Sequence, residues 1–272
     1  MIIKTTHPPV RILAIAGSDS SGGAGVQADI KTISALGGYA MSAITAITAQ
    51  NTQGVEAVQL TPPELVRAQV RAVLEDVGVD AIKIGMLGDA FIAASVADVL
   101  HDVTVPIILD PVMVATSGDA LLEDDAIQII RSRLIPMARL ITPNIPEAEA
   151  LSGQKITNIN TQRAAAEALL SMGPKAVLIK GGHGEGDILV DFLLWKKGEA
   201  VLESKRIETT STHGTGCTLA SALAVFLAQS LSLTDAVQLA RRYVRGAIKN
   251  APGFGAGHGP LDHGWINTGE RS

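Results

Sequence analysis

The segment from Thr209 to Ser221 (TTSTHGTGCTLAS) brings together residues suited to phosphate binding and proton transfer, where a polar loop passes into an apolar helical run. Gly214 and Gly216 let the backbone turn tightly and present N–H groups to a ligand, and the dipole of the following helix adds positive charge there. Helix starts of this kind bind phosphate. Cys217, the only cysteine, falls in the first helical turn, where the dipole favours thiolate over thiol. The segment predicts an anion hole beside a base or nucleophile.

A structural interpretation of the same segment is also open. Thr212 or Thr215 can cap the helix, the glycines can merely turn the chain, and Cys217 can be a small buried residue. The rest of the chain has to distinguish the two interpretations.

Polar residues follow each apolar run for which we predict a strand. These residues are Gly17 to Asp19, Gln50 and Asn51, Gly85 and Met86, Asp110 to Met113, Thr142 to Asn144, and Lys180 to His183. In open α/β sheets the ligand binds outside the carboxyl ends of the strands. We therefore expect one crevice to collect all of them.

Asn144 and Glu147 lie three residues apart at a predicted helix start, so both side chains share one face and offer two oxygen ligands. Mg²⁺ binds in this sparse manner, through one or two side chains, water and substrate phosphate. The alternative is an asparagine cap with a glutamate in the first turn. Asp110 likewise precedes a proline, and an aspartate there often only begins a turn.

Lys180 follows an apolar strand and precedes two glycines, so its ammonium can neutralise a phosphate in the crevice. The alternative is a solvated surface lysine. His183, His213, His258 and His263 lie on glycine-rich loops without metal-ligand spacing, and we interpret them as structural or supporting residues.

Two nucleotide-binding motifs are present only in part. Gly17 to Gly22 has the frame of a P-loop, but Gly23 stands where that motif needs its lysine. Gly23 to Ala28 fits the dinucleotide pattern GxGxxA, yet no Asp or Glu occurs between Asp29 and Glu56 to bind a ribose. Phosphoryl transfer without a P-loop still needs positioning, a metal and positive charge. Gly214 to Cys217, Lys180, and Asn144 with Glu147 would supply these parts.

Strands and helices alternate along the chain, with turn signals between them. We predict strands over Arg11 to Ala16, Ala40 to Thr48, Ala81 to Ile84, Pro106 to Leu109, Arg139 to Ile141 and Ala176 to Ile179. Helices are predicted over 26–36, from a Thr61 capping box to Val77, from Asp89, over Glu123 to Leu134, on either side of Gly153 and Asn160, and over 216–229 and 234–247. Asp187 to Ile207 alternates apolar and polar residues and predicts an antiparallel hairpin at a sheet edge. The pattern indicates an α/β fold with a mostly parallel sheet and helices on both faces.

Composition narrows the possible partners. The 272 residues are 47% hydrophobic and carry a net charge of -5, so we expect one domain over residues 1–272 and no nucleic-acid-binding surface. A single cysteine favours a reducing compartment, and we expect the cytoplasm. No run of eighteen apolar residues predicts a membrane span.

The motifs GSDSSGGAGVQAD, ITAITAQNTQGV, KIGML, LDPVMVATSGD, TPNIPEAEAL, KGGH, THGTGCTLASALA and GAGHGP closely resemble those of the hydroxymethylpyrimidine/phosphomethylpyrimidine kinases of thiamine synthesis. The resemblance runs from about Ile12 to His263 and leaves residues 1–10 outside. It implies the ribokinase-like three-layer α/β/α fold. A cysteine at the position of Cys217 is typical of these kinases and of some related pyridoxal kinases.

The resemblance implies ATP and Mg²⁺ as cofactors and a small pyrimidine as the substrate. It implies Cys217 as the base, with the Gly214, Thr215 and Gly216 amides holding the transferring phosphate and Lys180 contacting ATP. Asp110, Asn144 and Glu147 would organise Mg²⁺. The residues that the resemblance implies for binding the pyrimidine are Gly17, Ala24, Asp29, Gln50, Met86 and Val112. A homodimer is also implied.

Two other functions stay open. One is a pyridoxal kinase of the same fold, which takes a similar hydroxymethyl heteroaromatic substrate. The other is a regulatory protein that binds the pyrimidine without catalysis. Thr52 to Gln59 and the predicted hairpin are candidates for a segment that closes over the site.

Overall fold

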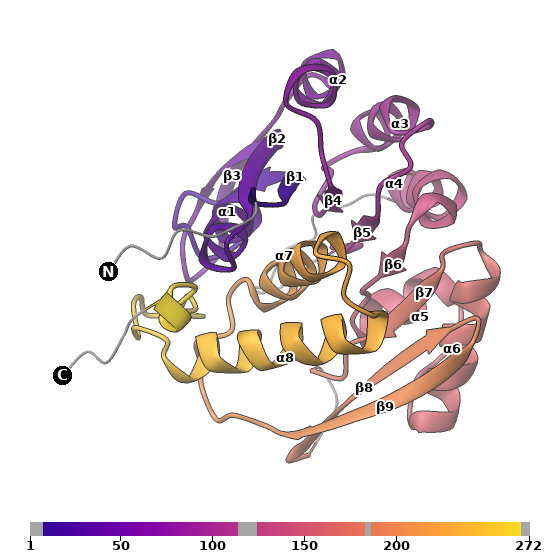
Figure 1. Cartoon of the computed structure of the whole chain (residues 1–272). Helices are drawn as coiled ribbons and strands as arrows, with labels where there is room; N and C mark the ends of the chain where they lie inside the picture. The colour runs from indigo at the N-terminus through magenta and orange to yellow at the C-terminus, as the bar shows by residue number, and fades with distance from the viewer. Residues whose placement is uncertain (1–7, 114–123, 183–185, 268–272) are drawn as a thin grey trace.

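A central β-sheet organises the computed structural model, which describes residues 8–113, 124–182 and 186–267. Within these residues the sheet has nine strands in the order β3-β2-β1-β4-β5-β6-β7-β8-β9 (Figure 1). The strands are β1 (Arg11–Ser18), β2 (Tyr39–Gln50), β3 (Val55–Leu60), β4 (Ala81–Ile84), β5 (Ile107–Leu109), β6 (Leu140–Ile141), β7 (Ala176–Ile179), β8 (Ile188–Trp195) and β9 (Gly198–Lys205).

Strands β2, β1, β4, β5, β6 and β7 run parallel to one another, whereas β3, β8 and β9 pair antiparallel with their neighbours. The hairpin β8–β9 forms one edge of the sheet. Both the mostly parallel sheet and the edge hairpin that the sequence predicts are therefore confirmed.

Helices cover both faces of the sheet (Figure 1). One face carries α1 (Gly25–Ala35), α7 (Thr215–Ala228) and α8 (Leu233–Lys249). The other carries α2 (Pro63–Ala72), α3 (Ala90–Val99), α4 (Asp124–Ile129), α5 (Ile145–Ser152) and α6 (Ile159–Ser171). Shorter turns are η1 (Val73–Val77), η2 (Ile130–Leu134), η3 (Ile135–Met137) and η4 (Trp265–Asn267). The predicted three-layer α/β/α arrangement is confirmed.

Strand periodicity explains the two-sided core. In β1, Leu13 and Ile15 pack into the cluster under α2 and α3, while Ile12 points into the cluster under α7 and α8. Successive side chains of a strand face opposite sides, so a strand between two helical layers is apolar throughout.

Two local predictions need correction, and a third is only partly described. The helix after Thr61 begins at Pro63 with Pro62 as the N-cap and no side-chain cap, because a proline rather than the threonine occupies the capping position. Most of the segment Thr52 to Gln59 is not a loop, since Val55–Leu60 forms the edge strand β3. The helix predicted from Glu123 is described only from Asp124, and residue 123 lies outside the described part of the chain.

The register of the parallel strands aligns their carboxyl ends. Ile84 pairs with Leu109, Leu109 pairs with Ile141, and an isolated parallel bridge joins Asn144 to Lys180. The polar residues that follow β4, β5, β6 and β7 are consequently brought to one edge of the sheet.

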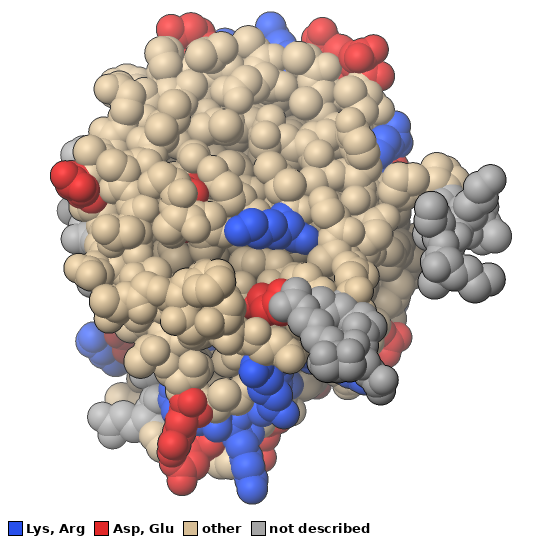
Figure 2. Space-filling model, turned by 90° about the vertical axis from the view of Figure 1, so that its left-hand side faces the viewer, with Lys and Arg blue, Asp and Glu red and all other residues tan. Residues whose placement is uncertain are grey.

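Surface charge is sparse on the face seen in Figure 2, where the coloured Lys, Arg, Asp and Glu side chains lie mainly around the rim. This face shows no extended basic patch of the kind that binds nucleic acid. Among the described residues, no helix is both long and apolar enough to cross a membrane.

Candidate active site

Helix α7 begins at the glycine-rich segment singled out in the sequence. Its N-cap is Gly214, with φ of 81°, and a Cβ at this position would overlap the carbonyl oxygen of Gly23. Only glycine meets both requirements, so the loop turns sharply against its neighbour. The Thr215 N–H donates to the Thr212 carbonyl at 3.3 Å. Neither threonine caps the helix through its side chain, which leaves the anion-hole interpretation of the segment the better supported one.

Asp110 and Lys180 lie directly beside this helix start. Lys180 Nζ donates to Asp110 Oδ1 at 2.7 Å, and Thr142 Oγ1 donates to the same oxygen at 2.9 Å. A Cβ placed on Gly216 would lie 3.1 Å from Asp110 Oδ2 and 3.3 Å from Lys180 Nζ. Burial disfavours the charged ammonium, but Asp110 and Glu147 outweigh it and raise the pKa of Lys180. The predicted cation is therefore charged and adjacent to the predicted anion hole.

Asn144 and Glu147 form a capping box at the start of α5. Asn144 Oδ1 accepts from the Glu147 N–H at 2.9 Å, and Glu147 Oε2 accepts from the Asn144 N–H at 2.8 Å. Asn144 is therefore a helix cap with Glu147 in the first turn, as the structural alternative predicts. Burial, with the nearby charge of Asp110 adding to it, raises the pKa of Glu147 to about 7 although Lys180 opposes the rise.

One buried oxygen at this edge of the sheet has no protein partner. Asp110 Oδ2 is buried and accepts no hydrogen bond within the described part of the chain. An orphaned carboxylate oxygen facing a phosphate site is suited to a hard cation. No group of three or more His, Cys, Asp or Glu side chains that could hold a metal is found among residues 8–113, 124–182 and 186–267. The donors present fit Mg²⁺ shared with a phosphate rather than a cage made by protein alone.

Four of the residues expected around the pyrimidine lie at the ends of β1, β2, β4 and β5, namely Gly17, Gln50, Met86 and Val112. Met86 packs against Gly17, where an added Cβ would meet the Met86 methyl group. Gln50 is half-buried, with Oε1 accepting from Thr48 Oγ1 at 3.3 Å. The Val112 N–H donates to the Asp110 carbonyl at 2.8 Å, which ties one flank of this region to the predicted metal site.

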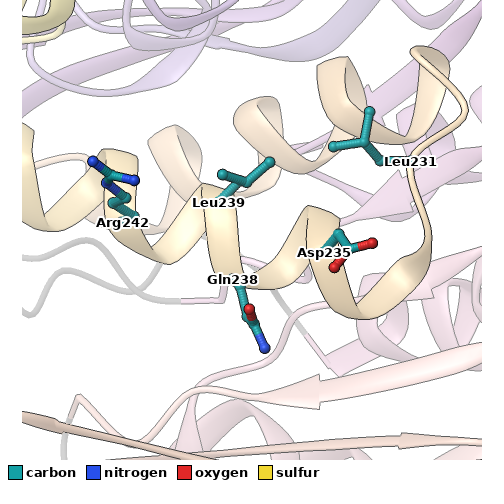
Figure 3. A pocket seen from close by; sticks show the side chains of 5 residues that line it. All are labelled: Leu231, Asp235, Gln238, Leu239 and Arg242. Atoms are coloured by element: carbon teal, nitrogen blue, oxygen red, sulfur yellow. The ribbon is translucent and has the colours of Figure 1, made fainter.

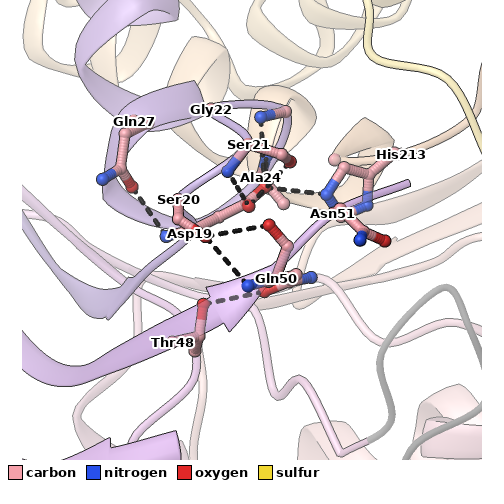
Figure 4. Close-up of polar contacts among 12 residues, drawn as sticks. Asp19, Ser20, Ser21, Gly22, Ala24, Gln27, Thr48, Gln50, Asn51 and His213 are labelled. Carbon is pink, nitrogen blue, oxygen red and sulfur yellow. Dashed lines mark hydrogen bonds and ion pairs between the residues drawn. The ribbon is translucent and has the colours of Figure 1, made fainter. Parts of the chain in front are cut away.

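A single carboxylate organises the loop between β1 and α1 (Figure 4). Asp19 Oδ2 accepts from the Ala24 N–H at 2.7 Å and the Gly23 N–H at 3.1 Å, and lies 2.7 Å from His213 Nε2. Its Oδ1 accepts from the Ser21 N–H and hydroxyl, both at 2.8 Å. Burial alone would raise the pKa of Asp19, but the partners His213, Ser21 and Ala24 lower it to about 2. Asp19 therefore holds Ala24 in place and also contacts His213, in the loop that leads into α7.

Asp29, which the resemblance implies as a substrate contact, is occupied by other partners in the structure. It sits within α1 with no exposed surface, where Oδ2 accepts from Lys83 Nζ at 2.8 Å and Oδ1 from Ser221 Oγ at 2.7 Å. Both oxygens already accept hydrogen bonds, so a pyrimidine reaches Asp29 only after this buried pair rearranges. Direct contact between Asp29 and the substrate stays a prediction.

Cys217 occupies the first turn of α7, as the sequence predicts, and its thiol is half-buried. Burial opposes the effect expected of the helix dipole on this thiol, so the thiolate at Cys217 stays a prediction. Burial raises the pKa of Cys217 to about 11, and the carboxylates of Asp29 and Asp110 add to the rise. Lys83 and a hydrogen bond donated by the Gly25 N–H act in the opposite direction.

The sequence patterns do not identify Lys83, and they place Asp19 at a strand end without identifying its bonding role. Asp19 stands in a loop whose serines and glycines suggest only turns, although an aspartate before such residues commonly binds the following N–H groups. Lys83 interrupts the apolar strand AIKI, and a lysine at a buried strand position requires a partner. His213 is structural, as expected, whereas His183 lies outside the described residues.

A separate hollow lies on α8, away from the carboxyl ends of the parallel strands (Figure 3). It is lined by Leu231, Asp235, Gln238, Leu239 and Arg242. Its lining contains no glycine and none of the strand-end residues gathered at the start of α7, so we assign it no role in the chemistry.

Comparisons with known proteins agree with this geometry. A sequence model of the family described as "Phosphomethylpyrimidine kinase" matches residues 19–262. The hydroxymethylpyrimidine/phosphomethylpyrimidine kinase of Streptomyces coelicolor is 48% identical over 258 residues, covering 95% of each chain.

Two solved structures are similar as well. The crystal structure of phosphomethylpyrimidine kinase from Clostridium difficile has a TM-score of 0.79 and 44% identity, covering 88% of this chain and 99% of that one. Pyridoxal kinase from Staphylococcus aureus, in complex with AMP-PCP and pyridoxal, has a TM-score of 0.87 and 34% identity, covering 96% of both chains.

Proposed function

The chain belongs to the phosphomethylpyrimidine kinase family, and we propose that it uses ATP to phosphorylate 4-amino-5-hydroxymethyl-2-methylpyrimidine and then the resulting monophosphate. The products are the monophosphate and the diphosphate that serve thiamine biosynthesis. The one site at the start of α7 carries out both steps.

The observation that carries this proposal is the contact between the start of α7 and the Asp110–Lys180 pair. The Gly214 to Gly216 backbone supplies N–H groups and a positive helix end, and the Lys180 ammonium borders Gly216. Catalysis of phosphoryl transfer consists mainly of positioning and of stabilising charge on the transferring group. Gly214, Thr215 and Gly216 hold the transferring phosphoryl group, and Lys180 neutralises the ATP phosphates.

In the first step the substrate hydroxymethyl oxygen attacks the γ-phosphorus of ATP. The new P–O bond forms as the bond to the β-phosphate oxygen breaks, and ADP leaves. The alcohol proton passes to the Cys217 sulfur, which must be a thiolate to accept it. Burial raises the pKa of the thiol to about 11, so groups that stabilise negative sulfur control how much base is present.

The second step has a different requirement. Its acceptor is a phosphate oxygen that is already ionised near neutral pH, since the second pKa of a phosphate monoester is about 6. No base is needed, so Cys217 contributes mainly to the first step.

Asp110, Asn144 and Glu147 would hold Mg²⁺, the first through its unpartnered Oδ2. Bound Mg²⁺ supplies charge that offsets the phosphate oxygens during transfer. Asn144 and Glu147 fix each other through the capping box, so their remaining lone pairs are presented at a set position.

For the pyrimidine, Gln50 offers an amide to the ring nitrogen and amine, and Met86 and Val112 cover the ring face. Gly17 and Ala24 contribute backbone contacts from a loop fixed by Asp19. Asp29 acts on the same group once its buried pair opens.

A pyridoxal kinase is the second candidate, favoured by the close structural match to a kinase solved with pyridoxal. ADP release by the purified chain with ATP and Mg²⁺ separates the candidates, using the hydroxymethylpyrimidine, its monophosphate or pyridoxal as the acceptor. We expect turnover of both pyrimidines and at least about tenfold lower kcat/KM for pyridoxal. A preference for pyridoxal would overturn the assignment. Tight pyrimidine binding without ADP release would instead identify a regulatory protein.

We also propose that residues 1–272 form one kinase domain that acts as a homodimer in the cytoplasm. A single sheet runs through the described chain, in support of one domain. Tyr39, Ile47 and Val58 are 53%, 59% and 47% exposed along the β2 and β3 edge, and such apolar side chains favour contact with a second copy. Sedimentation of the purified chain measures the oligomeric state.

A further inference from the structure

A lysine ammonium is buried in the core beneath the proposed active site. Lys83 lies on β4 between Ile82 and Ile84 and has no exposed surface. Its Nζ donates to Asp29 Oδ2 at 2.8 Å, and Gly85 leaves the space that its terminus occupies. The desolvation cost of a buried ion pair often exceeds its attraction, and well-packed apolar residues serve the core as well or better. Stability alone therefore gives little reason for this pair.

Helices α1 and α7 connect the pair to the turn of α7 that carries Cys217. Gly25, at the start of α1, lowers the pKa of the Cys217 thiol through its backbone N–H. One turn further along both helices, Ser221 Oγ donates to Asp29 Oδ1 at 2.7 Å. Residues four apart share a helix face, so Cys217 and Ser221 on α7 match Gly25 and Asp29 on α1. The thiol and the buried pair thus belong to one continuous contact between the two helices and β4.

Four charged groups act on the sulfur from the elements around it. Lys83 on β4 and Lys180 after β7 carry ammonium groups, while Asp29 on α1 and Asp110 after β5 carry carboxyl groups. After burial, which raises the pKa of Cys217, Lys83 makes the largest contribution and lowers it, whereas both carboxylates raise it. Lys83 itself remains fully charged, because Asp29, Cys217 and Asp110 outweigh the effect of its burial.

We propose that Lys83 and Asp29 are positioning residues that act through Cys217. The buried Lys83 ammonium stabilises the negatively charged sulfur. The Asp29 carboxylate holds that ammonium in place and weakens its attraction for the sulfur. This inference deepens the proposed function, and it rests on that function only for the role of Cys217 as the base.

The test follows the charge of the sulfur directly. Cys217 is the only cysteine of the chain, so the rate of alkylation by iodoacetamide reports this thiol alone. Rates are measured for the full chain without substrate, over a pH series, for the wild type, Lys83→Met and Asp29→Asn. We expect Lys83→Met to slow alkylation at pH 8 by at least about tenfold and Asp29→Asn to speed it by a similar factor, each corresponding to about one pKa unit.

Two further variants separate charge from loosening of the core. Lys83→Met combined with Asp29→Asn removes both charges, restores a neutral pair and should bring the alkylation rate back toward the wild-type value. Asp80→Asn removes a carboxylate that pairs with Arg11 at the opposite end of β4 and should leave the rate unchanged. Circular dichroism confirms that each variant is folded.

The proposal is supported if the alkylation rate falls in Lys83→Met and rises in Asp29→Asn. Shifts in the same direction, or shifts no larger than that of Asp80→Asn, would overturn it, because loosened packing exposes the thiol in either variant. Alkylation needs no substrate, so this outcome is independent of whether the chain phosphorylates a pyrimidine. Should pyrimidine turnover be absent while the opposite shifts are observed, the proposed function fails and the role of the ion pair stands.

Discussion

The Asp19 carboxylate lies 2.7 Å from Nε2 of His213, and this contact joins two loops that are 194 residues apart in the chain. The same Asp19 oxygen accepts the N–H groups of Gly23 and Ala24. His213 directly precedes the glycine at which α7 begins. One carboxylate therefore sets the position of the loop proposed for the pyrimidine relative to the loop proposed for the phosphate.

Replacing Asp19 with asparagine should weaken both the fold and the activity. The amide nitrogen that replaces one oxygen cannot accept, so at least one buried N–H is left without a partner, at a cost of about 1–3 kcal/mol. We expect urea denaturation to show this loss together with a fall in kcat/KM of at least about tenfold. Asp98→Asn, which removes an exposed partner of Arg133, is the matched control and should change neither quantity measurably. An Asp19 variant with wild-type kcat/KM would contradict the coupling of the two loops.

The contribution of Asp19 to the free energy of unfolding depends on pH, because its pKa is about 2 in the folded state. Because this pKa lies below the ordinary value near 4, the stabilisation is present in full above pH 4 and is lost as the pH falls through 2. The difference in the free energy of unfolding between wild type and Asp19→Asn should shrink by about 2 kcal/mol between pH 5 and pH 2. A difference that is constant over this range would show that the carboxylate charge is not what stabilises the loops.

Gly214 should tolerate no side chain, whereas Gly153 provides a control with a similar backbone. Both glycines have positive φ, 81° and 74°, but a Cβ on Gly214 meets the Gly23 carbonyl while nothing lies within 4 Å of a Cβ on Gly153. Gly153→Ala should cost about 1–2 kcal/mol of stability and leave activity intact. Gly214→Ala should cost more and lower kcat at least about 100-fold, because the phosphate-binding amides are displaced. Equal effects of the two variants on kcat would argue against the anion hole.

Asp110→Asn should alter the requirement for Mg²⁺. The amide keeps the size of the side chain but removes the charge of an oxygen that has no partner among the described residues. We expect the Mg²⁺ concentration for half-maximal activity to rise at least about tenfold. Asp80→Asn removes a carboxylate that pairs with Arg11 just before β4, at the end of the strand away from the site, and serves as the control. An unchanged Mg²⁺ requirement would remove Asp110 from the proposed metal site.

The sequence predicts most of the fold because its signals are local. Apolar runs end at glycine or polar residues, and the carboxyl ends of parallel strands meet, so the gathering of Lys180, Asp110 and Asn144 follows from strand order alone. The edge strand β3 is missed because almost all of its residues are exposed and no buried face marks it. The Thr61 capping box fails because two consecutive prolines move the helix start.

The site itself is predicted less completely, for electrostatic reasons. The charge state of Cys217 depends on burial and on carboxylates from other elements, and neither can be derived from a position in the first turn of a helix. The Asp29–Lys83 pair links residues 54 positions apart, and only the folded packing of α1 on β4 reveals it. Likewise the Asp19–His213 contact has no local signature.

The most direct test of the account is the effect of Cys217→Ala on each phosphoryl transfer measured separately in single turnovers, with the hydroxymethylpyrimidine or its monophosphate as the only acceptor. The variant lacks the proton acceptor, so transfer to the alcohol should slow at least about 100-fold. Transfer to the monophosphate should slow less than about tenfold, because that oxygen is already ionised. Equal loss in both steps would contradict the role of Cys217 as the base.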